Sequence, residues 1–262
     1  MVRRSSRVAL VFFACAVLLW PQRRSDPDPQ ALIEQSRRKA LEYSKSLPDF
    51  VCTELVNRYV DRRMRNQWTL SDKLTVKLSY FQQKEDHKLL LVNGQPSDQD
   101  YTSLVGAVGE GEFGGTLESI FDPHSRTEFR WESWKTVHKR RAAVYNYSVA
   151  RENSRYLLVA GVVGAEHRAV VGYHGSIEID AESGEVLHFT YQADHIPKIL
   201  ELDYSTSSVD YDLAAVGGRD YLLPMHAETI MRSGSMAMWN EVEFKEYRKF
   251  SSDSNITFDP GK

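Results

Sequence analysis

The histidine and carboxylate side chains of this chain are the first candidates for chemistry. Its eight histidines include no HxH or HxxxH pair. His174 and His188 lie on the polar sides of two neighbouring predicted strands, and Asp180 is close to both in the sequence. Two histidines on adjacent strands, without a third ligand in register, are not enough for a zinc site. We therefore expect no metal site and no cofactor.

A hydrolytic site is the second chemistry to consider, and it would use His174, His188 and Asp180. The nearest nucleophile pattern, Gly172–Ser176, misses the spacing of G-x-S-x-G. A nucleophile elbow also needs a strand-to-helix turn, whereas this segment alternates like one continuous strand. Polar side chains on one face are expected of any half-exposed sheet. We expect no catalytic residue and a protein that is not an enzyme, and a hydrolase stays the least favoured alternative.

A third candidate is the segment Gly109–Gly114, which fits the letters G-x-G-x-x-G. That pattern binds a pyrophosphate where a strand leads into a helix inside a parallel βαβ unit. The neighbouring segments here read as antiparallel strands, and Glu110 and Glu112 would place two carboxylates beside the phosphates. We therefore interpret the segment as a glycine-rich loop.

Aromatic side chains are abundant, with 13 Tyr, 11 Phe and 5 Trp. Large rings fill the interior of a curved sheet at low entropic cost. If they do not fill it completely, they line a cavity for an apolar ligand. The sequence leaves both outcomes open. If a ligand cavity exists, we expect its lining to include Tyr80, Phe129, Trp131, Trp134, Tyr145 and Tyr147.

The elements that must hold these side chains are mostly strands. A helix is predicted over residues 30–46, because Asp28 is a good N-cap, Pro29 suits a first turn and Pro48 stops the helix. From Phe50 onward the apolar side chains recur with period two, which indicates strands. In the first half the predicted strands lie near residues 50–61, 71–82, 86–92, 127–138, 142–150 and 156–163.

The second half repeats this alternation between tight turns. Residues 169–181 and 187–191 flank the turn Ser183-Gly184 and predict a β-hairpin. Further strands follow near residues 208–213, from Tyr221 and over residues 236–250. The chain is therefore predicted to be mainly β. We expect a curved antiparallel meander of about ten or eleven strands, a half-barrel with the N-terminal helix and a short helix or loop across its concave face.

Residues 98–122 interrupt the meander with five glycines and a short helical stretch at 116–121. So long an interruption is either a lid-like loop or a helix laid across the sheet. If it is a lid, we expect Gly109, Gly111 and Gly114 to belong to it.

The amino end carries an export signal. Three arginines in residues 1–7 precede the uncharged run 8–20, whose 13 residues cover about 20 Å as a helix, short of the roughly 30 Å hydrocarbon core. We read residues 1–30 as a signal peptide or signal anchor plus spacer, and residues 31–262 as a single β-rich domain. The protein is expected to be periplasmic or otherwise exported. If the signal is not cut, residues 8–20 would hold it to the inner membrane.

The net charge of the chain without residues 1–30 limits the partners that it can bind. The whole chain has a net charge of −3, and without the five Arg and two Asp of residues 1–30 it carries 28 basic and 34 acidic residues, a net charge of −6. Such a balance argues against nucleic-acid binding. Cys52 would be the only thiol of the exported part, and its place in the apolar run Phe50–Cys52 predicts a buried, unreactive side chain.

Several stretches of the chain resemble a group of secreted bacterial proteins of unassigned function: LPDFVCTE (47–54), GEFGGTLESIFDP (111–123), FRWESW (129–134), VGYHGSIEID (171–180), YLLP (221–224) and NEVEFKEYRKF (240–250). The architecture is similar to the periplasmic lipoprotein carrier and the related sigma-regulatory sensor domains. That second resemblance implies a half-open barrel that holds acyl chains. No binding residue of those proteins is matched to a position of this chain.

Together these observations favour a non-enzymatic protein of the bacterial cell envelope that binds an apolar ligand: an acyl chain, a lipid or a lipoprotein. The alternative is a structural or protein-interaction module with a fully packed core and an envelope protein as partner.

Overall fold

The computed structural model describes residues 26–101, 104, 111–162 and 164–250. The predicted signal segment, residues 1–20, lies outside this part of the chain. Within it, no helix combines the length and the apolar character that crossing a membrane requires.

The amino-terminal helix forms where its capping residues predict. Helix α1 spans Pro29–Ser46, and the Asp28 carboxylate accepts hydrogen bonds from the backbone N–H groups of Gln30 and Ala31. The helix ends one residue before the stretch Leu47-Pro48, where proline cannot continue it. The residues that it buries are Leu32, Ile33, Ser36 and Ala40.

Eleven strands form one antiparallel sheet in the order β4-β3-β2-β1-β13-β12-β11-β10-β9-β6-β5. The sheet is not closed into a barrel. It confirms the predicted mainly β fold class. The strands are β1 (Phe50–Asp61), β2 (Thr69–Phe81), β3 (Lys84–Val92), β4 (Gln95–Pro96), β5 (Glu128–Val137), β6 (Arg140–Val149), β9 (Gly172–Asp180), β10 (Val186–Asp194), β11 (Tyr204–Val216), β12 (Arg219–Ser233) and β13 (Met236–Lys249).

Two meanders meet in the middle of this sheet. The first runs from β1 to β4 and the second from β5 to β13, and β1 pairs with β13 along most of its length, from Phe50 opposite Lys249 to Asp61 opposite Ala237. Turn signals predict which consecutive strands are neighbours. Turn signals carry no information about the pairing of β1 with β13, which lie at the two ends of the domain. This pairing places β1 in the interior of the sheet.

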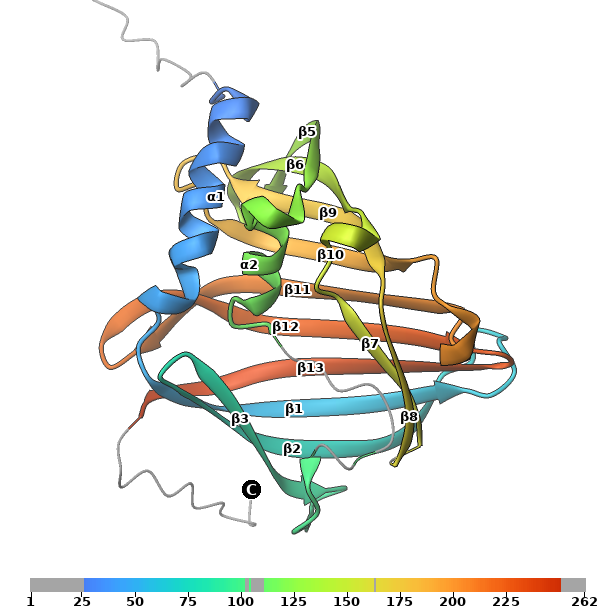
Figure 1. Cartoon of the computed structure of the whole chain (residues 1–262). Coiled ribbons are helices and arrows are strands. Elements are labelled where there is room, and N and C mark those ends of the chain that lie inside the picture. The colour runs from blue at the N-terminus through green and yellow to red at the C-terminus, as the bar shows by residue number, and fades with distance from the viewer. Residues whose placement is uncertain (1–25, 102–103, 105–110, 163, 251–262) are drawn as a thin grey trace, which may run out of the picture.

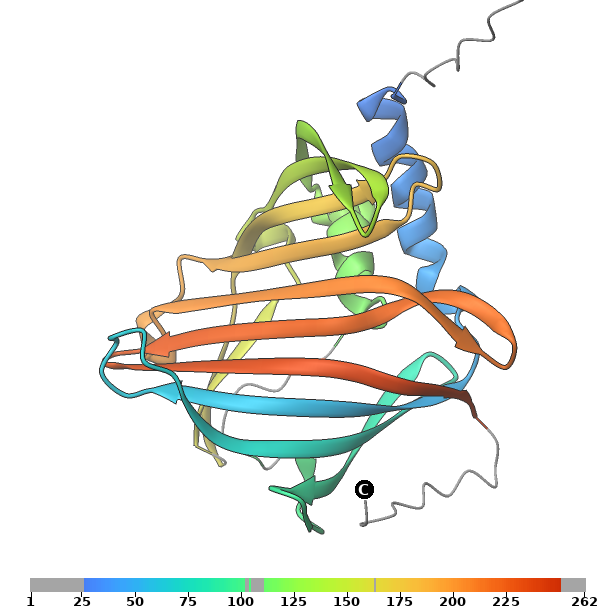
Figure 2. The same ribbon diagram turned by 180° about the vertical axis from the view of Figure 1, so that it is seen from behind.

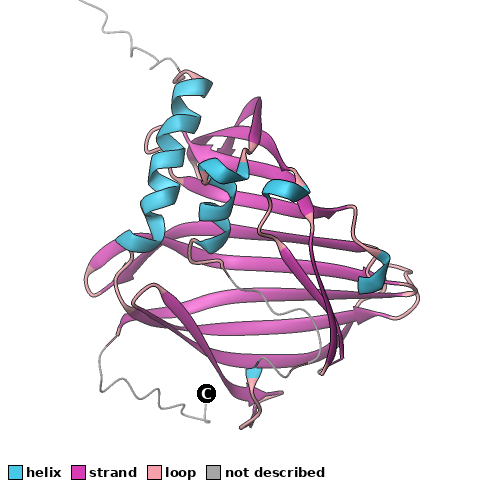
Figure 3. Ribbon diagram, in the orientation of Figure 1, coloured by secondary structure: helices cyan, strands magenta, loops and turns pink. Residues whose placement is uncertain are grey.

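The two faces of the sheet have different surroundings (Figures 1 and 3). Helix α1, the short helix α2 (Gly115–Phe121) and a separate two-stranded hairpin all lie on one side, which we call the inner face. Seen from behind, the opposite or outer face carries no helix (Figure 2). The strands consequently alternate between side chains that pack inward and polar side chains that point outward.

The separate hairpin, β7 (Leu157–Val162) and β8 (Ala165–Val170), is the main departure from the predicted meander. Residues 169–181 read as one strand in the sequence, but the chain turns out of the hairpin at Val171 before β9 begins. One side of the hairpin packs on the turn after β10, through Leu158, Val171 and Leu200. The hairpin therefore crosses the inner face without joining the main sheet (Figure 1).

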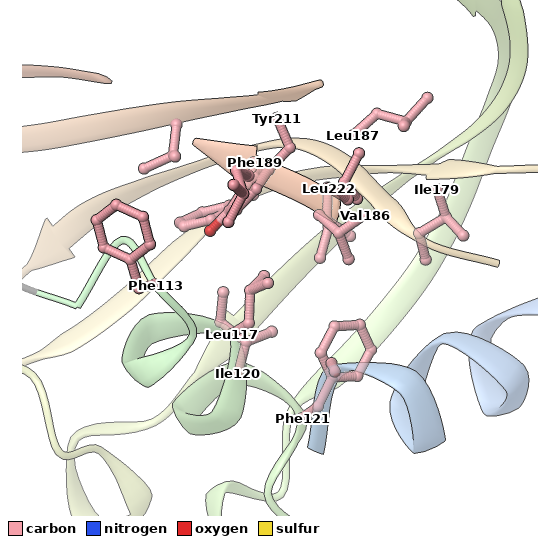
Figure 4. Packing of buried hydrophobic residues seen from close by; sticks show 14 of the residues in the cluster. Phe113, Leu117, Ile120, Phe121, Ile179, Val186, Leu187, Phe189, Tyr211 and Leu222 are labelled. Atoms are coloured by element: carbon pink, nitrogen blue, oxygen red, sulfur yellow. The ribbon is translucent and has the colours of Figure 1, made fainter. Parts of the chain in front are cut away.

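The main core lies between the helices and the inner face. From α2, Leu117 and Ile120 point toward Phe189 and Tyr211 on β10 and β11, and Phe121 points toward Val186 and Ile179 (Figure 4). Cys52 belongs to the same buried cluster, and burial raises the pKa of its thiol well above the ordinary value. The prediction of a buried cysteine is confirmed, and its lack of reactivity stays a prediction.

Candidate functional site

A cavity of about 1060 Å³ lies on the inner face. Its walls come from the β2–β3 turn, α2, the β7–β8 hairpin and the inward side chains of β9 to β12. We call it the inner cavity. Its lining includes Tyr80, Lys84, Glu85, His87, Phe113, Thr116, Arg155, Tyr156, Leu157, Val159, Arg168, Tyr173, Tyr191, Ser207, Thr229 and Met231.

Tyrosine rings form much of the floor of the inner cavity. The ring of Tyr156 lies edge-on to those of Tyr173 and Tyr191, with centroids 5.7 and 5.2 Å away. Burial raises the pKa of the Tyr173 and Tyr191 hydroxyls above the ordinary value. These phenols therefore stay neutral at physiological pH, and the floor offers flat aromatic surface with few polar points.

The β7–β8 hairpin supplies an apolar wall. Leu157 is 48% exposed and Val159 is 43% exposed, and both line the cavity. Leu158, which alternates with them on β7, is buried beside Val171 and Leu200 and also lines the cavity. Strand alternation therefore leaves Leu157 and Val159 on the exposed side of the hairpin, where nothing within the described residues covers them fully. The two side chains add exposed apolar surface to the lining of the cavity.

The opposite end of the cavity is polar and acidic. Glu54 on β1 is buried, and its Oε1 lies 3.3 Å from Nε2 of His87 on β3. Glu85 lies two residues before His87 on the same face, and its carboxylate accepts a hydrogen bond from the backbone N–H of Gly111. Together with Glu112 these side chains form what we call the inner carboxylate cluster.

The members of this cluster perturb one another strongly. Removal from water, together with the charges of Glu85 and Glu54, raises the pKa of Glu112 to about 8. Burial is also the largest cause of the raised pKa of Glu85. For His87, burial alone would lower the pKa, but the hydrogen bond to Glu54 and the charges of the glutamates outweigh it and raise the pKa to about 9. Such shifts are frequent at functional sites.

The segment before α2 holds this end of the cavity in place. Phe113 is 1% exposed and packs against Phe50, Tyr80 and Phe244. The Tyr211 hydroxyl donates a 2.6 Å hydrogen bond to the Glu112 carbonyl oxygen. The segment is therefore fastened to the inner face at two neighbouring residues.

Two of the three glycines expected in a lid fall in this segment. Gly111 and Gly114 have φ angles of +96° and +117°, and a Cβ on Gly114 would lie 3.0 Å from the ring of Tyr43. Both positions need glycine because of the backbone conformation. Gly109 lies outside the described residues. The structure shows residues 111–114 as the lead into a helix across the inner face, and a role as a lid stays a prediction.

The six aromatic residues expected at a ligand cavity lie in three places. Tyr80 lines the inner cavity. Tyr145 and Tyr147 are buried in the main core, where Phe129 and Trp134 pack against them or their neighbours. Trp131 is 44% exposed on β5. The structure therefore brings together Tyr80 with residues that the sequence analysis did not select.

The histidines considered for catalysis lie on the outer face and do not meet. His174 is opposite Gln192, whereas His188 is opposite Glu178. The Nδ1 atom of His174 lies 2.7 Å from Asp194, and that of His188 lies 2.8 Å from Asp210. Asp180 instead accepts a hydrogen bond from Arg140. Each candidate thus has its own separate partner.

The inner carboxylate cluster was missed because each member looks ordinary in the sequence. Glu85 and His87 sit in a charged stretch, KEDHK, that reads as a solvated turn. Glu54 and Glu112 do stand inside two of the recognisable motifs, VCTE and GEFGG. One signal could have identified the cluster. In Phe50–Val56, Glu54 is a charged residue at a position where the alternation predicts an inward-facing apolar side chain.

The sequence matches no known family profile, and no curated protein matches it. Among solved structures, a LolA superfamily protein from Nitrosomonas europaea is 8% identical with a TM-score of 0.37, over 85% of this chain and 93% of the other. A putative outer membrane lipoprotein-sorting protein domain from Vibrio parahaemolyticus is 11% identical with a TM-score of 0.37, over 85% and 92%. The MucA/MucB complex of Pseudomonas aeruginosa follows with 11% identity and a TM-score of 0.23, over 81% and 94%.

At these identities and TM-scores, none of the three structures identifies a ligand or a partner of this chain.

Proposed function

We propose that this protein is a non-enzymatic, exported carrier that holds the apolar chain of an amphipathic ligand, such as an acyl chain, in the inner cavity. The observation that carries the proposal is the cavity itself. It is bounded by tyrosine rings on one side and by the exposed Leu157 and Val159 on the other. A module with a fully packed core would leave no such cavity.

The volume suits this kind of ligand. Small-molecule sites enclose about 300–1,000 Å³, and the inner cavity, at about 1060 Å³, has room for a long chain. Each methylene group that moves from water onto apolar surface gains about 0.8 kcal/mol. A chain of ten or more such groups would therefore bind well even after the cost of ordering is subtracted.

The charged residues at the ends of the cavity account for the polar part of the ligand. Lys84, Arg155 and Arg168 contribute cations to the lining, while Glu85 and His87 belong to the inner carboxylate cluster. An amphipathic molecule can place its chain between the hairpin and the tyrosines and leave its headgroup at one of these polar ends. A purely apolar molecule would leave them unused.

A binding role also agrees with where the histidines lie. His174 and His188 contact separate aspartates on the outer face, on the far side of the sheet from the cavity. The proposal includes export to the periplasm, which is supported by the charged and apolar pattern of residues 1–20.

Native mass spectrometry of the purified protein, with extraction of bound lipid, tests the proposal. We expect co-purifying lipid and saturable binding of fluorescent acyl probes that carry either a carboxylate or an amine headgroup. Val159→Glu should weaken probe binding at least about tenfold, because it places a charge on the apolar wall. Absence of lipid together with absence of probe binding would overturn the proposal.

Leu70→Glu is the matched control. Leu70 is 41% exposed, close to the 43% of Val159, and it does not line the inner cavity. We expect this variant to bind the probes like the unchanged protein. Equal loss of binding in both variants would show that the probes adhere to exposed apolar surface in general.

A further inference from the structure

The outer face carries a group of metal-ligating side chains at its centre. His226 and Glu228 are two residues apart on β12, so they point to the same side, and Glu241 on β13 is directly opposite Glu228. One ligand atom from each lies within 4.8 Å of the other two, and all three side chains are half-buried. His174 and His188, which the sequence alone does not support as a metal site, are not part of this group.

The register creates a charge conflict that a cation would relieve. Like charges directly opposite each other on adjacent strands destabilise a sheet. Among the ion pairs of the described residues, the one basic partner of Glu228 and of Glu241 is His226. A single imidazole carries at most one positive charge and cannot balance two carboxylates, whereas a divalent cation can.

The distances are close to those of a coordination shell. Zinc bound tetrahedrally at about 2.0–2.2 Å holds its ligand atoms about 3.3–3.6 Å apart. The Nε2 atom of His226 lies 3.6 Å from Oε1 of Glu241 and 3.9 Å from Oε1 of Glu228. Small side-chain rotations would bring the three atoms onto one ion.

Neighbouring groups hold the ligands in orientation, as outer partners do in known metal sites. Asp210 Oδ2 lies 3.8 Å from Nδ1 of His226, on the side of the ring away from the glutamates. Asn57 Nδ2 donates a 3.2 Å hydrogen bond to Oε2 of Glu241, which leaves Oε1 to face His226. At 3.8 Å the Asp210 contact is longer than a hydrogen bond, and a small rotation of the ring would let Asp210 accept one from Nδ1 and leave Nε2 for a metal.

We propose that His226, Glu228 and Glu241 bind a divalent transition-metal ion of the zinc class, with a fourth position open to water. The imidazole nitrogen is a ligand of borderline softness that suits Zn²⁺, whereas Mg²⁺ and Ca²⁺ are bound by oxygen ligands alone in most sites. The site lies on the opposite side of the sheet from the inner cavity. It joins β12 and β13 at the middle of the sheet and does not depend on the proposed carrier function.

Titration calorimetry of the metal-free protein with ZnCl₂ and with MgCl₂ tests the site. We expect one Zn²⁺ per chain at micromolar or tighter affinity and much weaker binding of Mg²⁺. His226→Ala should remove this binding event, and the isosteric changes Glu228→Gln and Glu241→Gln should each weaken it at least about tenfold. Asp210→Asn should weaken it by about 10- to 100-fold, as a positioning residue does.

His174→Ala is the control, since His174 also pairs with an aspartate on the outer face but lies outside the group. It should bind Zn²⁺ like the unchanged protein. Co²⁺ gives a second readout, because a tetrahedral site produces visible absorption bands that His226→Ala should abolish. Unchanged Zn²⁺ affinity in a folded His226→Ala protein, or no binding by the unchanged protein, would overturn the proposal.

Discussion

The inner and outer faces of the sheet are made from the same strands, yet their chemistry differs. On β11 and β12, Val209 and Ala227 are paired and buried in the core, while the next pair, Asp210 and His226, faces outward. Shifting either strand by one residue would exchange the two sets. Burial of the apolar set therefore fixes the position of every charged group on the other side.

Carboxylates show the difference most clearly. On the inner face, removal from water dominates and raises the pKa of Glu112 and of Glu85. On the outer face, burial would also raise the pKa of Asp210, but the hydrogen bond and charge of His188 outweigh it and lower the pKa. The inner face thus favours neutral acids beside a cavity, and the outer face favours ionised acids that pair with cations.

The largest predicted effect is the loss of stability when a buried aromatic ring is removed, compared with the loss when an exposed ring is removed. Phe113→Ala should reduce the free energy of unfolding by about 3–5 kcal/mol, because it empties a site enclosed by four other aromatic rings. Trp131→Ala on β5 should cost less than about 1 kcal/mol, because that ring is 44% exposed. Urea unfolding of both variants measures the contrast, and equal losses would mean that Phe113 does not anchor the segment before α2.

The fold was largely predictable because alternation and turn residues are local signals. The strand pattern around Ile177 and Phe189, the Gly184 turn and the Asp28 cap all appear in the structure as expected. The pairing of β1 with β13 was not predictable, since it joins residues almost 200 positions apart. The β7–β8 hairpin was missed for a similar reason: its strands look like others, and only tertiary packing decides that they leave the main sheet.

The sequence predicted the type of residue at the candidate site, but it did not identify most of the individual residues. An excess of aromatic residues indicates large inward side chains, and Tyr80 does line the cavity. Whether a ring packs in the core or lines the cavity depends on where the hairpin leaves a gap above the sheet, and the sequence does not show that gap. Trp131 and Tyr173 are equally plausible in the sequence, but one is exposed on β5 and the other lies at the cavity floor.

The next prediction concerns the pH dependence of stability. The pKa of Glu112 rises from 4.5 to about 8 in the folded chain, and that of His87 rises from 6.5 to about 9. Folding therefore favours the protonated form of both groups. Their contribution to stability is complete below about pH 4.5 and is lost as the pH rises through 8 and 9. The free energy of unfolding should fall by about 1–3 kcal/mol between pH 5 and pH 9.

Glu112→Gln should remove the contribution of Glu112, which begins near pH 4.5, because glutamine stays neutral throughout, and should leave the contribution of His87 above about pH 6.5. Glu34→Gln, on the exposed side of α1, should leave the curve unchanged. Thermal melts across the pH range measure all three proteins. A decline between pH 4.5 and 6.5 that persists in Glu112→Gln would assign that part of the curve to groups other than Glu112.

The last prediction compares two His–carboxylate pairs on opposite faces, and its weaker member has the smallest expected effect. The His174–Asp194 pair is short, at 2.7 Å, but the histidine side chain is 49% exposed and the aspartate 32% exposed. Exposed ion pairs contribute about 0.2–1 kcal/mol, because water and salt screen them. His174→Ala should therefore lower the free energy of unfolding by less than about 1 kcal/mol, and 0.5 M NaCl should remove most of that difference.

The His87–Glu54 pair is longer, at 3.3 Å, but its side chains are only 9% and 5% exposed. His87→Ala would leave the Glu54 carboxylate without its cation beside Glu85, so the loss should exceed that of His174→Ala by at least about 2 kcal/mol and should resist salt. Urea unfolding at low and high salt compares the two variants. Equal losses would mean that the burial of an ion pair does not decide its contribution to the stability of this protein. The proposed difference between the inner and outer faces would then not hold for ion pairs.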